Sequence, residues 1–155
     1  MKYLGEQGYH CVGIDRSAQA LDCARKYGSV CQADIENGPW PLTVTGQPET
    51  FDAVIVTNYL WRPLFPTLLA SLAPSGVLLY ETFAQGNETV GKPSRPDFLL
   101  KQAELLQWCQ GLRVIAFEDG FLPQPERFVQ RIAAIQTAAT TESAQMPTRH
   151  PLSLE

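Results

Sequence analysis

The sequence has no excess of basic residues and very little histidine. Its 155 residues include 12 Lys and Arg against 16 Asp and Glu, which gives a net charge of −4 and a pI of about 5.2. An acidic chain lacks the basic stripe that phosphate backbones require, so a nucleic-acid partner is disfavoured. The only histidines are His10 and His150, which leaves little room for a histidine-based metal site. We therefore expect neither bound nucleic acid nor a bound metal.

The sequence also lacks paired cysteines and long hydrophobic runs. No C-x-x-C pair occurs among the four cysteines Cys11, Cys23, Cys31 and Cys109, which disfavours zinc and thioredoxin-type chemistry. Cys11 and Cys31 fall in predicted strands, where buried cysteines are common, and a reactive thiol is the alternative. No apolar run is long enough to span a membrane, and "MKYLGEQGYH" lacks a signal-peptide core. We expect a cytoplasmic protein with reduced thiols and no membrane contact.

The sequence does contain an alternation of strand and helix patterns. In the first third, the patterns predict a helix over 2–7, a strand His10–Ile14, a helix over 18–27, the strand "SVCQADI" and a loop over 36–50. Ser17 is a candidate N-cap, and Gly8 and Gly28 are expected to end the two helices. "FDAVIVTNYL" is the clearest strand, because it contains an unbroken apolar run rich in β-branched residues.

The remaining patterns predict a parallel sheet that closes with a hairpin. A helix with two prolines in its first turn, the strand "GVLLYETF", a loop over 84–97 and a helix from 97 or 98 to about 110 follow in order. "LRVIAFEDGF" and "RFVQRIAAIQ" are joined only by "LPQPE", which is too short for a parallel crossover. We predict one α/β domain over 1–136, mostly parallel with helices on both faces, and a disordered tail over 137–155.

Two consecutive strands are each followed by an acidic residue. Asp15 ends the first strand and Asp34 ends the second, so both are expected at the same edge of the sheet. A nucleoside across that edge offers ribose hydroxyls to one acid and an adenine amine to the other, and both groups are donors. The alternatives are that Asp15 caps the following helix and that Asp34 caps a turn over 36–38.

Three further features have both a functional and a structural interpretation. Asn58 ends the third strand, where its amide could orient a reacting group or satisfy the turn. Arg62 could bind an anionic substrate, although a solvated helix start fits it better. The loop over 84–97 could close as a lid or be an ordinary mobile loop.

The ordered set of motifs resembles one enzyme family. The run "GYHCVGIDRS", "CQADIENGPWPL" and "FDAVIVTNYLWRPLFPTLLASLAPSGVLLYETF" is similar to class I S-adenosylmethionine-dependent methyltransferases, most of all to small bacterial members grouped with the tellurite-resistance type. The resemblance covers about residues 1–136 and includes the closing hairpin. It differs in one turn, where Pro-Ser-Gly replaces the usual Pro-Gly-Gly.

The resemblance implies a cofactor and a set of binding residues. S-adenosylmethionine would donate a methyl group to a small-molecule substrate. Asp15, with Arg16 beside it, would hold the ribose, Asp34 and Ile35 would hold the adenine, and Asn58 would lie near the methyl group. Transfer by in-line displacement mostly requires alignment and a dry pocket, so no catalytic residue is assigned.

The chain departs from the family because it lacks the first strand and its glycine-rich turn. In the family that strand lies between the second and fourth, so its loss leaves two strands without a neighbour. Each unmade buried hydrogen bond costs about 1–3 kcal/mol, against a domain stability of about 5–15 kcal/mol. A recorded chain that starts late is the favoured explanation. A decayed remnant is another, and a gap closed by strands or a partner is the third.

Two other functions follow from the same residues. Exposed sheet edges recruit strands, so the chain could be a non-catalytic fragment or interaction module, including a homo-oligomer that pairs through those edges. An NAD-dependent oxidoreductase is the second alternative, because an acid after the second strand suits NAD equally well. Asp34, the hairpin and the absence of room for a substrate domain count against it.

Overall fold

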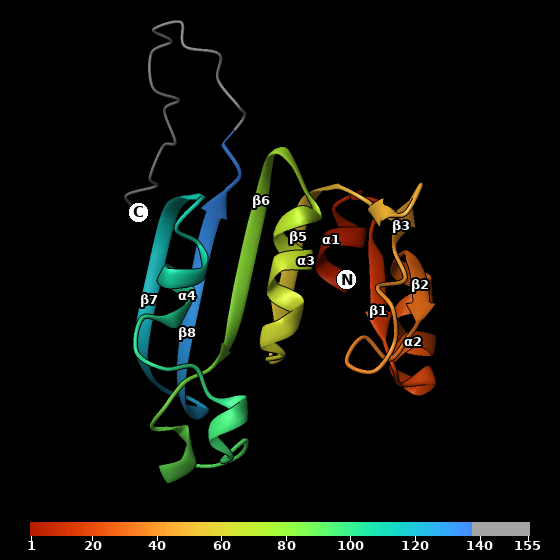
Figure 1. Ribbon diagram of the computed structural model, residues 1–155. Coiled ribbons are helices and arrows are strands. Elements are labelled where there is room, and N and C mark those ends of the chain that lie inside the picture. The colour runs from red at the N-terminus through yellow and green to blue at the C-terminus, as the bar shows by residue number, and fades with distance from the viewer. Residues whose placement is uncertain (138–155) are drawn as a thin grey trace, which may run out of the picture. The chain divides into compact units, whose positions relative to one another are not determined.

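The computed structural model describes residues 1–137, which its contacts divide into two units (Figure 1). The first unit is Met1–Glu49 and the second begins at Thr50. Each is described here by itself. The predicted tail lies outside the described residues, except for Thr137. The prediction of a single domain over 1–136 stays a prediction.

The first unit contains the predicted helix–strand–helix–strand order. Its elements are α1 (Lys2–Glu6), β1 (Val12–Asp15), α2 (Ala18–Ala24), the 3-10 turn η1 (Arg25–Tyr27) and β2 (Ser29–Gln32). The strands β1 and β2 are parallel, with Asp15 opposite Gln32. Ser17 caps α2 as predicted, because its Oγ accepts the N–H of Ala20 at 3.2 Å. Gly8 follows α1 with a φ of 86°, which is the expected conformation for a helix stop.

A small hairpin replaces part of the loop predicted over 36–50. β3 (Thr43–Val44) and β4 (Gln47–Pro48) pair antiparallel. The two residues between them, Thr45 and Gly46, have φ values of 50° and 79°. Two positive φ values in a two-residue turn match the twist of a hairpin, and glycine adopts one at no steric cost. The local pair Thr-Gly was the signal that the loop prediction overlooked.

The second unit contains a four-stranded sheet in the order β5-β6-β8-β7 (Figure 1). Its elements are β5 (Phe51–Thr57), η2 (Arg62–Leu64), α3 (Phe65–Ala70), β6 (Leu72–Phe83), η3 (Asn87–Thr89), η4 (Pro96–Phe98), α4 (Glu104–Trp108), β7 (Arg113–Pro123) and β8 (Glu126–Ile135). β5 and β6 are parallel, with Val54 opposite Leu78. The predicted hairpin of β7 and β8 is confirmed.

The sheets are mixed rather than mostly parallel. β8 lies between β6 and β7 and runs antiparallel to both, so one hairpin converts two of the three ladders in this sheet. The predicted α/β class with a closing hairpin is confirmed, but the parallel pairs among the described residues are only β1 with β2 and β5 with β6.

The helix predicted from 97 or 98 to 110 is wrong over its first half. Only α4 is α-helical there, because the preceding segment bonds to the end of β6 instead. Leu100 N–H donates to Phe83 O, and Gln85 N–H donates to Leu100 O, both at 2.9 Å. Ala103 then turns the chain with a φ of 55°. Leu106, predicted to face inward, is 36% exposed.

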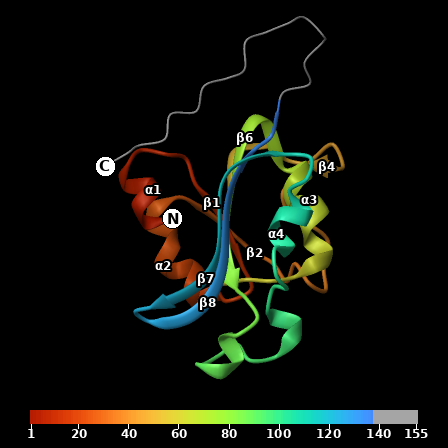
Figure 2. The ribbon, with the colours of Figure 1, turned by 90° about the vertical axis from the view of Figure 1, so that its left-hand side faces the viewer.

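The core of the second unit lies on one face of its sheet. Leu78, Tyr80 and Ile132 are buried there, and α3 and α4 lie on the same side of this sheet (Figure 2). Phe65 of α3 contacts the rings of both Tyr80 and Trp108, at centroid distances of 5.8 and 4.5 Å. These contacts join β6, α3 and α4.

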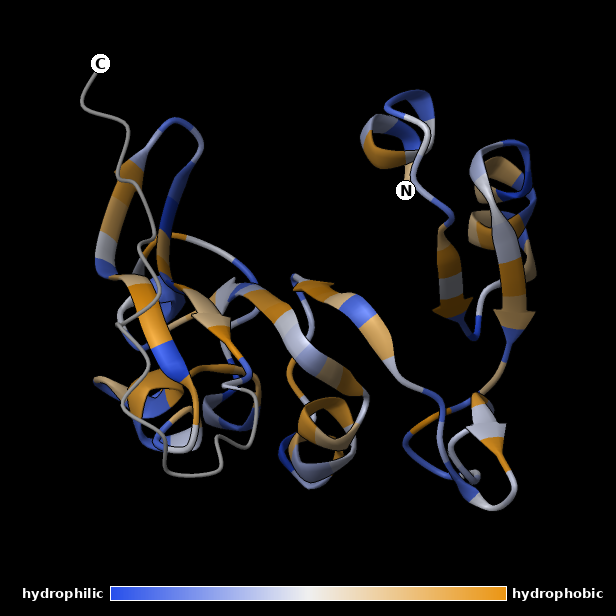
Figure 3. Cartoon of the chain, turned by 90° about the horizontal axis from the view of Figure 1, so that it is seen from above, coloured by the Kyte–Doolittle hydropathy of each residue, from blue (hydrophilic) through white to orange (hydrophobic). Residues whose placement is uncertain are grey.

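The opposite face of the same sheet is less covered. Ile55 and Leu79, which are opposite each other in the register, are 43% and 41% exposed. Within this unit the helices therefore do not lie on both faces, as we had predicted for the sheet. Hydrophobic residues are nevertheless frequent in the strands of both units (Figure 3). Across residues 1–137, no helix has the length and hydrophobicity to cross a membrane.

Candidate functional site

The two predicted acids of the first unit lie at one edge of its parallel sheet. Asp15 is the last residue of β1, and its carbonyl accepts the N–H of Ala33 at 3.1 Å. Asp34 follows directly, so the carboxyl ends of β1 and β2 bring both residues to the same edge. This is the edge at which parallel α/β sheets bind ligands.

Asp15 caps the turn that leads into α2. Its Oδ1 accepts the N–H of Ser17 at 2.8 Å, which is the structural alternative foreseen for this residue. No other hydrogen bond involves this carboxylate among the described residues. Because a carboxylate has about four acceptor positions, the cap leaves Asp15 able to accept further donors.

Asp34 is more heavily engaged in its own loop. Oδ1 accepts the N–H groups of Glu36 and Asn37, and Oδ2 accepts the Asn37 amide at 2.9 Å. The hydrogen bond from the Asn37 side chain is the largest cause that lowers the pKa of Asp34, followed by the bond from Glu36 N–H. The turn-capping alternative is therefore observed. Three accepted bonds leave about one acceptor position free.

Arg16 and Ile35 flank the two acids. The Arg16 guanidinium lies near enough to contribute, as the smallest cause, to the lowered pKa of Asp34. The Arg16 carbonyl accepts the side-chain N–H of Gln32 at 3.1 Å, which ties the end of β1 to the end of β2. Ile35 is half-buried and Arg16 is exposed.

Asn58 ends β5 in the second unit, so the structure does not group it with the other four predicted residues. Its backbone has a φ of 54°, and its N–H donates to Glu81 O at 2.9 Å. The side chain is exposed and forms no hydrogen bond within residues 1–137. A strained backbone conformation with a free amide is compatible with either interpretation of this residue.

Both interpretations of Arg62 are wrong. Its guanidinium forms a two-pronged ion pair with Glu104, at 2.7 and 3.0 Å, and also donates to the carbonyls of Asp97 and Leu99. Burial raises the pKa of Glu104, but the bonds from Arg62 and Lys101 N–H outweigh it, and the net shift is downward. Arg62 is thus neither solvated nor free to bind an anion.

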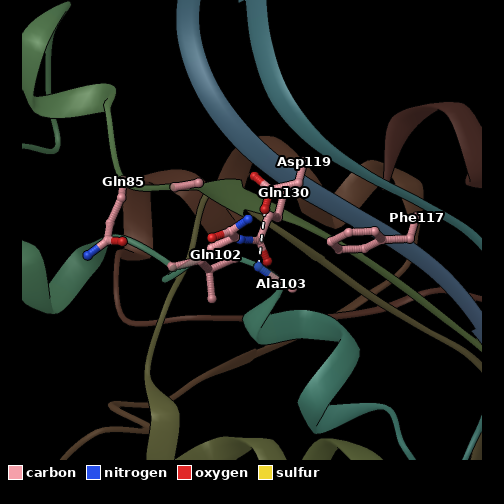
Figure 4. Close-up of a pocket in the computed structure, with 8 residues that line it drawn as sticks. Gln85, Gln102, Ala103, Phe117, Asp119 and Gln130 are labelled. Carbon is pink, nitrogen blue, oxygen red and sulfur yellow. Dashed lines mark hydrogen bonds between the residues drawn. The ribbon is translucent and has the colours of Figure 1, made fainter.

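A pocket of about 440 Å³ lies beside the carboxyl end of β6 (Figure 4). Its lining combines amide, carboxylate and aromatic side chains, including Gln85, Gln102, Ala103, Phe117, Asp119 and Gln130. Sequence reasoning missed all of these residues. They come from segments distant in the sequence and form no motif, so only the fold brings them together.

The loop over 84–97 is anchored at its start. Asn87 is buried, its side-chain N–H donates to Pro93 O at 3.0 Å, and its Oδ1 accepts the N–H of Phe128 at 3.2 Å. Arg95 and Asp97 form an exposed ion pair. The role of this loop as a lid stays a prediction.

The cysteines and acids of the described residues do not form a metal centre. No group of three His, Cys, Asp or Glu side chains within residues 1–137 has the spacing to hold an ion. All four thiols are free, and burial raises the pKa of Cys109 to about 11, which makes its thiolate scarce at neutral pH.

Comparison with known proteins gives a likeness at the level of structure. Neither the scan against family models nor the search of curated sequences finds a match. TehB from Haemophilus influenzae is similar, with a TM-score of 0.67 and 15% identity over 88% of this chain and 53% of that one. An S-adenosylmethionine-dependent methyltransferase from Methanosarcina mazei has a TM-score of 0.64 and 13% identity over 88% and 86% of the two chains.

A third similar structure contains a bound reaction product of the cofactor. The Burkholderia thailandensis 1,6-didemethyltoxoflavin-N1-methyltransferase, solved with its substrate and S-adenosylhomocysteine, has a TM-score of 0.61 and 14% identity over 88% of this chain and 65% of that one. The fold is that of the class I S-adenosylmethionine-dependent methyltransferases. At these identities the likeness establishes the fold alone, and the chain spans only about half of TehB.

Proposed function

We propose that this chain binds S-adenosylmethionine and transfers its methyl group to a small molecule. The observation that carries the proposal is the structural likeness to methyltransferases over 88% of the chain. In support, two acids lie at the carboxyl edge of a parallel sheet, where the fold binds nucleosides. A cytoplasmic location remains part of the proposal.

The residues of the first unit have suitable chemistry for the cofactor. Asp15 would accept hydrogen bonds from the ribose hydroxyls, because its cap uses only one acceptor position. Asp34 would accept the adenine amine with its remaining position, and the half-buried Ile35 would contact the ring. When bound, the cofactor supplies an electrophilic methyl group on a sulfonium. Asn58, with its free amide, would help to align the acceptor.

Calorimetric titration of the full chain with S-adenosylhomocysteine tests the proposal. We expect binding in the micromolar range that weakens at least about tenfold in Asp15→Asn, because a charge-assisted bond to the ribose is lost. Asparagine retains a side-chain oxygen for the N–H of Ser17, so the cap of α2 is preserved.

Asp22→Asn is the matched control. Asp22 is an exposed acid of α2 paired with Arg25, and its substitution should leave the affinity unchanged. If the folded chain does not bind S-adenosylhomocysteine, or if both variants behave alike, the assignment of Asp15 is contradicted.

A second candidate function is self-association through an open sheet edge. Among the described residues, β5 pairs only with β6, and its sequence "FDAVIVT" contains no Lys or Pro to block further pairing. We propose that a second copy pairs at this edge. Sedimentation velocity should show a concentration-dependent dimer that Ile55→Lys weakens and Val44→Lys, at another exposed site, does not. A monomer at every concentration would refute this candidate.

The oxidoreductase alternative has the same nucleotide edge as its basis. Quenching of NADH fluorescence by the full chain would support it, and competition by S-adenosylhomocysteine would place both ligands at the same acids.

A further inference from the structure

We infer that the pocket beside the end of β6 binds the methyl acceptor, and that this acceptor is an uncharged or cationic nitrogen heterocycle rather than an anion. The inference rests on the proposed function, because it assigns the second substrate of that reaction. It concerns only the second unit, in which all the lining residues lie.

The pocket lies at the edge of the sheet where strands deliver ligand-binding residues. Ala84, which lines it, directly follows β6. The bond from Asn58 N–H to Glu81 O places the end of β5 beside the end of β6, at the same edge. Its volume of about 440 Å³ falls in the range of sites for small molecules.

The wall of the pocket is held by dedicated hydrogen bonds. The fully buried Gln130 donates to Lys101 O at 2.6 Å and accepts the N–H of Leu105 at 3.2 Å. Asp119 accepts the N–H of Ala103 at 3.1 Å, and Ala103 has a φ of 55°. A residue held in this uncommon conformation by both flanking strands gives the wall a fixed shape.

The groups that face the pocket select the chemistry of the ligand. Gln85 and Gln102 are exposed, and their amides have no hydrogen-bond partner within residues 1–137 (Figure 4). Asp119 retains a second carboxylate oxygen, and Phe117 offers a ring for stacking. The lining contains no Lys or Arg. An anionic ligand would be repelled by Asp119 without compensation, whereas a ring nitrogen or amine N–H finds acceptors.

The transfer step balances with such an acceptor. The nitrogen lone pair forms a bond to the methyl carbon, and the carbon–sulfur bond breaks with its electron pair remaining on sulfur. The sulfonium becomes a neutral thioether, and the nitrogen gains the positive charge. Where that nitrogen carried a hydrogen, its proton passes to water at the exposed mouth beside Gln85 and Gln102.

A matched pair of probes tests the charge selectivity without the donor. Quinoline-4-carboxamide and quinoline-4-carboxylate have nearly the same shape but differ by one charge at pH 7. In NMR titrations of the ¹⁵N-labelled full chain, we expect the carboxamide to shift amides at 84–85, 100–103 and 117–119. The carboxylate should bind at least about tenfold more weakly.

A charge placed in the lining should reverse that preference. Gln102→Lys should make the carboxylate the tighter ligand, because the new cation pairs with it. Gln107→Lys adds the same charge at an exposed site of α4 outside the lining, and it should leave the ratio unchanged. Both substituted side chains are exposed, so the amide spectra should remain dispersed.

The outcomes separate this inference from the proposed function. Absence of saturable shifts at the pocket, or a ratio that Gln102→Lys does not alter, overturns the inference even if S-adenosylhomocysteine binds. Probe binding with the predicted selectivity supports the pocket's chemistry. If the same sample does not bind S-adenosylhomocysteine, it is the proposed methyl transfer that falls, and the acceptor assignment with it.

Discussion

The two units differ in the range of the interactions that hold them. In the first, the carboxylates of Asp15 and Asp34 bond to backbone groups two or three residues away. In the second, Arg62 bonds to Glu104 and Gln130 to Lys101, across 42 and 29 residues of sequence. The fully buried hydrophobic side chains described in the chain also lie in the second unit, except for Leu21.

This difference bears on how each candidate site is formed. The edge of the first unit takes its shape from turns that the local sequence encodes. The pocket of the second unit takes its shape from long-range bonds that require the whole sheet. We therefore expect substitutions in the second unit to change stability and pocket together, whereas those at the first edge change ligand affinity with little change in stability.

The largest expected effect comes from breaking the ion pair of Arg62. In Arg62→Ala, Glu104 keeps its charge with a side chain only 9% exposed and loses its partner. We expect a loss of about 3 kcal/mol in the free energy of unfolding, measured by urea denaturation. Arg95→Ala removes an exposed pair with Asp97 and should cost less than about 0.5 kcal/mol. Equal losses would show that burial does not distinguish the two pairs.

The same pair predicts a dependence on pH. Because the pKa of Glu104 is lowered on folding, the carboxylate contributes stability above its ordinary value of 4.5, and this contribution is lost as pH falls through the folded pKa. The stability difference between the unmodified chain and Glu104→Gln should therefore shrink below about pH 4.5. A constant difference down to pH 3 would contradict the lowered pKa.

Hydrogen exchange compares the units directly. We expect amides of β6 and β8 to exchange at least about 100-fold more slowly than those of β1 and β2, equivalent to ~2.8 kcal/mol of opening free energy. The reason is the scarcity of buried side chains in the first unit, where Leu21 alone is fully buried among the hydrophobic residues. Similar protection in both pairs of strands would remove the contrast between the units.

Much of the fold could be predicted because its signals are local. The apolar run of β5, the cap at Ser17 and the short link between β7 and β8 all lie within a few residues of what they determine. The segment over 97–103 could not be predicted in this way. Its hydrophobic spacing suits a helix, but its backbone partners are Phe83 and Asp119, which only the tertiary fold brings near.

The candidate site divides along the same line. The shared edge of Asp15 and Asp34 followed from the order of two parallel strands. Whether their carboxylates were free or capping was not decided by the sequence, because both uses need an acid at the same position. The pocket offered no signal, since Gln85, Gln102 and Phe117 are unremarkable residues until three segments meet.

Gln130→Met should show how far the pocket wall depends on one buried amide. The substitution keeps the side-chain volume but leaves Lys101 O and Leu105 N–H without their partner. We expect a loss of about 2 kcal/mol in unfolding free energy. Gln107→Met, at an exposed site of α4, should lie within about 0.5 kcal/mol of the unmodified chain. If Gln130→Met is neutral, another group satisfies the wall.

Tyr80→Phe gives the smallest expected effect and tests the link between β6 and the loop after β5. The Tyr80 hydroxyl donates to Tyr59 O at 2.8 Å, and burial raises the pKa of this phenol, so it stays protonated at neutral and moderately alkaline pH. Loss of the bond should cost about 1 kcal/mol, because phenylalanine keeps the ring contact with Phe65. Phe65→Leu, which removes that contact instead, is the comparison variant. A larger loss in Tyr80→Phe than in Phe65→Leu would mean that the hydrogen bond, rather than the packing of α3, fixes the loop that carries Asn58.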